Sequence, residues 1–159
     1  MPESMPGDGK QDIQAEVEAN LSEIGAKISA AAEEAGRARD DVSLIAVSKV
    51  QPNDRVEAAL IAGHRLFGEN RVQEAQSKWP DFKQRYDGVT LHLIGPLQTN
   101  KVRDAVSLFD VIETVDRPKL AAALKKEMDR QGVSRRCFVQ VNTGFLRLFA
   151  GVHLYKTTP

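Results

Sequence analysis

Short apolar runs alternate along this chain with longer amphipathic segments, and this alternation constrains the fold more than any other feature. The apolar runs have the length of β-strands that are buried on both faces. The segments between them carry apolar residues at helical spacing. Strands and helices that alternate with short connections are typical of a parallel α/β sheet, so we expect an α/β fold.

The pattern predicts five strands and five helices. The expected strands are 42–47, 65–68, 89–94, 111–115 and 138–141. The expected helices are 12–35, 53–62, 70–78, 99–108 and 116–130, the last of them capped by Asp116. About five βα units of this kind fit either an open doubly wound sheet or part of an eight-stranded barrel.

Composition excludes several classes of function. Lys and Arg together number 22, as do Asp and Glu, so the zero net charge predicts neither a nucleic-acid nor a membrane partner. Cys137 is the only cysteine and lies in an apolar run, so we expect a buried, unreactive thiol. The histidines are isolated from acids at ligand spacing, so no metal site is expected. The polar start and the lack of a membrane-spanning run predict a cytoplasmic protein.

The residues after the first strand exclude two common phosphate sites. The segment 48–52 (Ser-Lys-Val-Gln-Pro) contains no glycine, which argues against both a Rossmann dinucleotide site and a P-loop. In both α/β architectures, functional residues gather at the carboxyl ends of the strands. This rule directs attention to three strand ends.

Lys49 follows the first of these strands. A lysine held at the rim of an apolar barrel is partly desolvated, and its amine then acts as a nucleophile toward aldehydes. A lysine that only ends a strand and reaches water gives the same pattern.

Asn70 and His92 mark the next two strand ends. Asn70 offers an amide to a ligand, but it is equally suited to cap the following helix, with Gln73 completing a capping box. His92 alternates with two leucines and is either a site residue or a hydrogen-bonded core residue. Glu69 and Arg71 are candidates for an ion pair with each other or with groups at the rim. Lys101, near the start of a helix, either attracts an anion or is a solvated surface charge.

Four segments together resemble the pyridoxal-phosphate homeostasis proteins. They match that family in order and spacing, and they are Ala46–Lys49, Phe67–Asn70, His92–Lys101 and Val141–Gly144. The resemblance implies a fold similar to the amino-terminal domain of alanine racemase. The expected structure is thus a partial TIM-type (β/α) barrel, about five βα units of an eight-stranded barrel, preceded by an N-terminal helix.

The same resemblance implies a function. Members bind pyridoxal 5′-phosphate (PLP) on the lysine that aligns with Lys49, and they supply or buffer this cofactor without an assigned catalytic turnover. We therefore expect Lys49, Asn70 and His92 to bind the cofactor, in a protein that is monomeric. The alternatives are a PLP-dependent racemase or decarboxylase, which shares the barrel and the lysine, and an inactive fragment.

The resemblance ends at Gly144. We expect a flexible tail over 1–11, a partial PLP-binding barrel domain over 12–144 and an unrelated tail over 145–159. Because phosphate is often held by the loops after strands seven and eight of such a barrel, a chain truncated or frameshifted after Gly144 is expected to bind PLP weakly.

Overall fold

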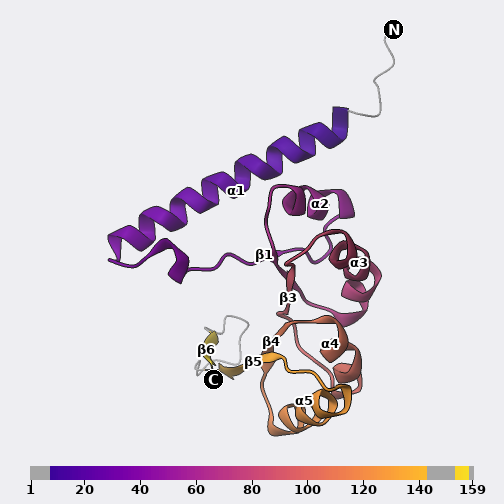
Figure 1. Cartoon of the computed structure of the whole chain (residues 1–159). Coiled ribbons are helices and arrows are strands. Elements are labelled where there is room, and N and C mark those ends of the chain that lie inside the picture. The colour runs from indigo at the N-terminus through magenta and orange to yellow at the C-terminus, as the bar shows by residue number, and fades with distance from the viewer. Residues whose placement is uncertain (1–7, 143–152, 158–159) are drawn as a thin grey trace. The chain divides into compact units, whose positions relative to one another are not determined.

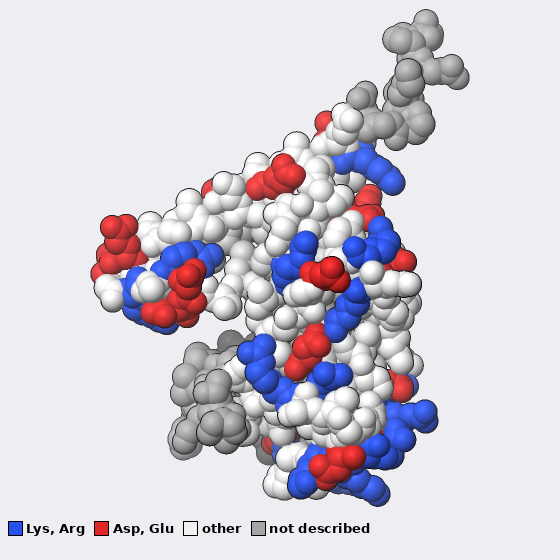
Figure 2. All heavy atoms as spheres, viewed as in Figure 1, with Lys and Arg blue, Asp and Glu red and all other residues white. Residues whose placement is uncertain are grey.

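The computed structural model describes residues 8–142 and 153–157, which form two compact units (Figure 1). The first unit is Met1–Arg65 and the second is Leu66–Pro159. Figure 2 shows Lys and Arg side chains interspersed with Asp and Glu on the face that it draws, in line with the zero net charge.

The first unit is built on a long helix. Helix α1 spans Asp8–Glu34, and the short 3-10 helix η1 (Arg39–Asp41), strand β1 (Ala46–Val47) and helix α2 (Asn53–Ile61) follow it. Two side-chain contacts join the helices: Arg55 donates to Glu16 at 2.8 Å, and Gln14 donates to the carbonyl of Ala58 at 3.4 Å. The buried residues of α2 are apolar and recur at helical spacing, which explains why this short segment is helical.

The second unit is a sheet with helices in the connections. Its strands are β2 (Leu66–Glu69), β3 (Thr90–Leu93), β4 (Val111–Val115), β5 (Arg136–Asn142) and β6 (His153–Thr157). Its helices are α3 (Val72–Arg85), the 3-10 helix η2 (Thr99–Lys101), α4 (Val102–Leu108) and α5 (Pro118–Gln131). Strands β2 to β5 are parallel neighbours in chain order, and β6 pairs antiparallel with β5.

The core of the second unit lies between the strands and helices α3, α4 and α5, which lie on the same side of the strands in Figure 1. Register places Phe67 beside Leu91, so apolar side chains of neighbouring strands share a face. Trp79 is fully buried and its ring lies 4.9 Å from that of Phe67, as expected for a packing residue. Each fully buried large apolar side chain contributes roughly 1.5–3 kcal/mol through removal from water. This packing fixes the strand ends from which the site is built.

The predicted α/β class is confirmed, and several element boundaries are wrong. Strand β4 has the expected bounds, but β1 is shorter than expected and is not buried on both faces. Helix α3 continues past Pro80, because Trp79 and Phe82 on either side of this exposed proline are both buried. The helix over 116–130 is capped by Arg117 rather than by Asp116, whose carboxylate accepts from the Arg117 side chain.

The two ends of the chain also differ from expectation. Helix α1 begins at Asp8, within the segment expected to be a flexible tail. Strand β6 was not predicted, because its ladder depends on β5 as a partner and not on an apolar pattern of its own.

Candidate functional site

Lys49 lies in a strained tight turn after β1. The amide of Gln51 donates to the carbonyl of Ser48 at 3.2 Å, which closes the turn around Lys49 and Val50. Val50 has a φ of 60°, and it is the one non-glycine residue with positive φ in the described part of the chain. A β-branched residue costs free energy in this conformation, and such strain often occurs at ligand sites. The turn presents Lys49 to solvent.

The predicted partial desolvation of Lys49 is wrong for this chain. Its side chain is exposed, whereas the neighbouring Ser48 is buried. The exposed amine is accessible to a small molecule from solvent. The apolar surroundings that were expected around the Lys49 amine are therefore not present in this structure.

His92 of β3 forms a buried pair with Glu113 of β4. The His92 Nδ1 lies 2.6 Å from Glu113 Oε1, and His92 is only 5% exposed. A carboxylate accepts hydrogen bonds, so Nδ1 carries the proton and, in the neutral ring, Nε2 is left as an acceptor. Within residues 8–142 and 153–157, Nε2 is buried without a hydrogen-bond partner. Such an atom is costly unless a further group satisfies it.

Asn70 approaches Gly95 more closely than any side chain at position 95 would allow. A Cβ built on Gly95 would lie 2.2 Å from the carbonyl oxygen of Asn70. One residue earlier in each segment, the amide of Ile94 donates to the carbonyl of Glu69 at 2.9 Å. The ends of β2 and β3 are thus joined through backbone atoms, which explains the need for glycine at position 95.

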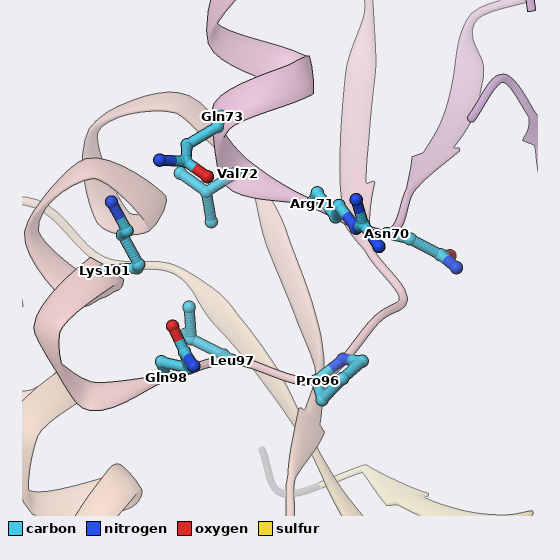
Figure 3. Close-up of a pocket in the computed structure, with 8 residues that line it drawn as sticks. All are labelled: Asn70, Arg71, Val72, Gln73, Pro96, Leu97, Gln98 and Lys101. Atoms are coloured by element: carbon cyan, nitrogen blue, oxygen red, sulfur yellow. The ribbon is translucent and has the colours of Figure 1, made fainter. Parts of the chain in front are cut away.

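The alternative that Asn70 caps a helix is wrong. The N-cap of α3 is Arg71, and no side chain caps this helix. The Asn70 side chain is half-buried and in Figure 3 points away from the other labelled groups. Helix capping therefore no longer explains an asparagine at this position.

The loop after β3 is held from the other side by the end of β4. Thr114 donates to the carbonyl of Gly95 at 2.7 Å, and Arg117 donates to the carbonyl of Leu97 at 2.8 Å. These bonds fix the loop between β3 and η2 against the end of β4 and the start of α5.

Glu69, the last residue of β2, is held by two side chains of α3. It is fully buried and accepts from Lys78 Nζ at 3.1 Å and from Trp79 Nε1 at 3.0 Å. The predicted pairing of Glu69 with Arg71 is therefore not formed; Lys78, which is also buried, takes that position. A buried ion pair of this kind favours one arrangement of the β2 end over alternatives.

A hollow of about 540 Å³ opens between the loops that follow β2 and β3 (Figure 3). All of its lining residues belong to the second unit, and they are Asn70, Arg71, Val72, Gln73, Pro96, Leu97, Gln98 and Lys101. Lys101, which the sequence singled out as an anion-attracting group, lies here. Hollows of this volume accept small organic molecules.

Sequence reasoning missed the residues that orient the predicted ones. Glu113 and Thr114 carried a signal, because each is polar within an otherwise apolar strand. Arg117 carried none, since its bond to the Leu97 carbonyl depends on the loop conformation.

Three further predictions concern Cys137, metal binding and membrane-spanning helices. Cys137, expected to be buried, is only half-buried, and this burial raises the pKa of its thiol above the ordinary value of 9.0. Its low reactivity stays a prediction. In the described residues, no group of three or more His, Cys, Asp or Glu side chains is placed to hold a metal. None of the helices in that part of the chain is long and apolar enough to cross a membrane.

The chain is similar to several curated proteins that share one name. The pyridoxal phosphate homeostasis protein of Vibrio cholerae is 40% identical over 129 residues, which is 80% of this chain and 55% of that protein. The Escherichia coli K12 protein of the same name is 37% identical over 136 residues, 85% of this chain and 58% of the relative. The chain thus spans little more than half the length of these relatives.

Solved structures give the same result. PipY of Synechococcus elongatus with PLP bound aligns with a TM-score of 0.61 at 43% identity, over 69% of this chain and 50% of PipY. PipY without PLP gives a TM-score of 0.64. A protein from Bifidobacterium adolescentis, described as unknown, aligns over 94% of this chain and 62% of its own with a TM-score of 0.78 at 28% identity.

The family is shown by a match over most of the chain. The family model described as "Alanine racemase, N-terminal domain" matches residues 19–155. Together with the PipY structures, this match confirms the expected α/β fold of the alanine-racemase type, present here in part. The chain therefore belongs to the family of the alanine racemase N-terminal domain.

Proposed function

We propose that this chain binds PLP through a Schiff base on Lys49 and acts, without catalytic turnover, in intracellular PLP homeostasis. The observation that carries the proposal is the strained turn that presents the Lys49 amine after β1. The names of the relatives and the PLP in the PipY structure support the choice of ligand.

The chemistry asked of Lys49 is a simple condensation. PLP supplies an aldehyde, whose carbon takes the neutral lysine amine with release of one water molecule to give the C=N bond. The exposed side chain reaches such an aldehyde without any opening of the fold. The bond from the Gln51 amide to the Ser48 carbonyl keeps the turn closed despite the strain at Val50, and this limits the directions that Lys49 can take.

His92 and Asn70 are proposed to contact the cofactor by hydrogen bonds. The buried Nε2 of His92 needs a partner, and the polar substituents of PLP offer donors for it. Glu113 holds the ring in the tautomer that leaves Nε2 as the acceptor. Asn70 carries donors and an acceptor on one amide, and its backbone is fixed against Gly95.

A second function deserves a test, because His92 and Glu113 form a pair of the kind that transfers protons. A racemase or decarboxylase needs an acid–base group besides the cofactor lysine, and a histidine held by a carboxylate suits that role. Measuring alanine racemisation with added PLP separates the two functions. Turnover that disappears in His92→Gln would favour the enzyme, and no turnover above the rate of free PLP would favour the binding protein.

The proposal is tested by absorbance titration of the purified chain with PLP. Lys49→Ala removes the amine, and Lys126→Ala, an exposed lysine of α5, is the matched control. We expect a saturable imine band in the wild type and in Lys126→Ala that Lys49→Ala lacks. Equal bands in all three proteins would overturn the proposal. A cooperative circular-dichroism melt of each protein shows whether the chain is folded and distinguishes this outcome from an inactive fragment.

The cytoplasmic location and the monomeric state remain predictions from the sequence. Size-exclusion chromatography with light scattering tests the second of these.

A further inference from the structure

The hollow between the loops after β2 and β3 combines features that the proposed role of Lys49 does not use. Its lining includes two cations, Arg71 and Lys101, and no carboxylate. In the described part of the chain, neither cationic side chain has a hydrogen-bond or ion-pair partner. By contrast, Lys78 and Lys83 in the same unit are each paired with an acid. The hollow therefore carries positive charge that no nearby acid neutralises.

The hollow is also preformed, because its two walls are fixed to each other. The backbones of Asn70 and Gly95 are in close contact, and the amide of Ile94 donates to the carbonyl of Glu69 at 2.9 Å, which joins the two walls. Thr114 and Arg117 fix the second wall by bonds to the carbonyls of Gly95 and Leu97. A rigid site loses less conformational entropy when a ligand binds.

The polar and apolar parts of the lining are separate. Val72 and Leu97 are buried, and Figure 3 shows their side chains facing each other across the hollow. Arg71 lies on one side of these two residues, while Lys101 lies on the other beside Gln73 and Gln98 (Figure 3). The Lys101 ammonium and the two glutamine amides on one side suit an anionic group with several acceptor oxygens, and the apolar pair beside them suits a small carbon skeleton.

We propose that this hollow binds a phosphate monoester that carries a small apolar group. Lys101, with the amides of Gln73 and Gln98 on the same side, holds the phosphate, which is a dianion near neutral pH. Val72 and Leu97 face the organic part, and Arg71 adds positive charge from the other side of the hollow. The site does not depend on Lys49, so it accepts esters that lack an aldehyde. The shared chemistry covers both PLP itself and other phosphate monoesters, and the experiment separates them.

The test measures binding of phenyl phosphate to the full chain by isothermal titration calorimetry. Lys101→Gln is expected to weaken binding roughly tenfold, the effect of removing one charge-assisted hydrogen bond. Arg71→Gln removes a more distant charge and is expected to weaken binding about threefold. Lys119→Gln, an exposed lysine at the start of α5, is the matched control, and Lys49→Ala tests independence from the Schiff base. Both should bind as the wild type does.

Each other outcome contradicts the proposal. Absence of binding, or equal binding by all variants, would show that the hollow is not a phosphate site. Loss of binding in Lys49→Ala would assign the phosphate to the PLP site instead. Benzoate, a monoanion of similar shape, should bind several-fold more weakly, and equal affinity would refute the preference for phosphate. Because Lys49→Ala removes the Schiff base without touching this hollow, failure here and failure of the proposed PLP function are distinguishable.

Discussion

The imidazole of His92 lies 2.6 Å from the carboxylate of Glu113, on the neighbouring parallel strand. One nitrogen of the ring is thereby satisfied, and the other is buried without a partner in the described part of the chain. Burial and the bond to Glu113 fit the alternative of a hydrogen-bonded core residue, whereas the unpartnered Nε2 is a feature that a core role leaves unexplained.

Replacing Glu113 by Gln is expected to let the His92 ring adopt both neutral tautomers. The amide of glutamine offers both a donor and an acceptor, so it no longer requires the proton to be on Nδ1. We expect ¹⁵N NMR of the His92 ring to show Nδ1 protonation in the wild type and a mixture in Glu113→Gln, with weaker PLP binding. Glu113→Ala should also lower the free energy of unfolding by about 1–3 kcal/mol, the cost of an unpaired buried group. An unchanged ring spectrum would contradict the assigned role of Glu113.

Gly95→Ala is expected to destabilise the chain. The new methyl group would collide with backbone atoms of Asn70, so the two loops would have to move apart. Overpacking of this kind costs roughly 1–3 kcal/mol. Gly25→Ala is the matched control, because Gly25 lies within α1 with nothing within 4 Å of the added Cβ and should become slightly more stable. Urea unfolding of both variants measures the difference. Equal stabilities would show that the two loops are free to separate.

Lys78→Met is expected to lower the free energy of unfolding more than Lys125→Met does. Lys78 is buried against the carboxylate of Glu69, and removing one partner of a buried pair costs about 3 kcal/mol or more. Lys125→Met removes an exposed pair with Asp129 at 2.7 Å, and it should change the free energy of unfolding by less than about 1 kcal/mol. Thermal or urea denaturation compares them, and a similar small loss in both would mean that the buried pair does not hold the end of β2.

Alkylation of Cys137 is expected to be slow at neutral pH. Burial raises the pKa of this thiol above 9.0, and only the thiolate reacts with iodoacetamide. The rate should therefore rise with a midpoint above pH 9.0. The Cys137 thiol ionises at a lower pH in the unfolded chain than in the folded chain. Its contribution to the free energy of unfolding is therefore fully present below the unfolded pKa and is lost as the pH rises through the folded pKa. A midpoint below that of a free thiol in the same buffer would contradict the burial.

The sequence was most informative where a local pattern was sufficient. The apolar run 111–115 predicted β4 with its observed bounds, and the last helix, predicted to end at residue 130, ends one residue later. Gly132 follows it with a φ of 65°, the usual conformation of a glycine after a helix. The alternation of such runs predicted the α/β class and the strand ends near which Lys49, Asn70 and His92 lie.

Residue pairs could not be predicted in the same way. The partnership of His92 with Glu113 depends on the register of β3 and β4, in which His92 lies beside Val111, two residues before Glu113 on the same face. The pairing of Glu69 with Lys78 depends on one turn of α3 facing the sheet. Strand β6 depends on a partner strand, which no local pattern reports.

The central claim is that Lys49 holds PLP, and borohydride reduction followed by peptide mapping tests it most directly. Reduction turns the C=N bond into a stable amine, so mass spectrometry can locate the attached pyridoxyl group. At one equivalent of PLP, we expect a single pyridoxyl group on the peptide that contains Lys49, and none in Lys49→Ala. Label spread over the exposed lysines, or equal labelling of the variant, would contradict it.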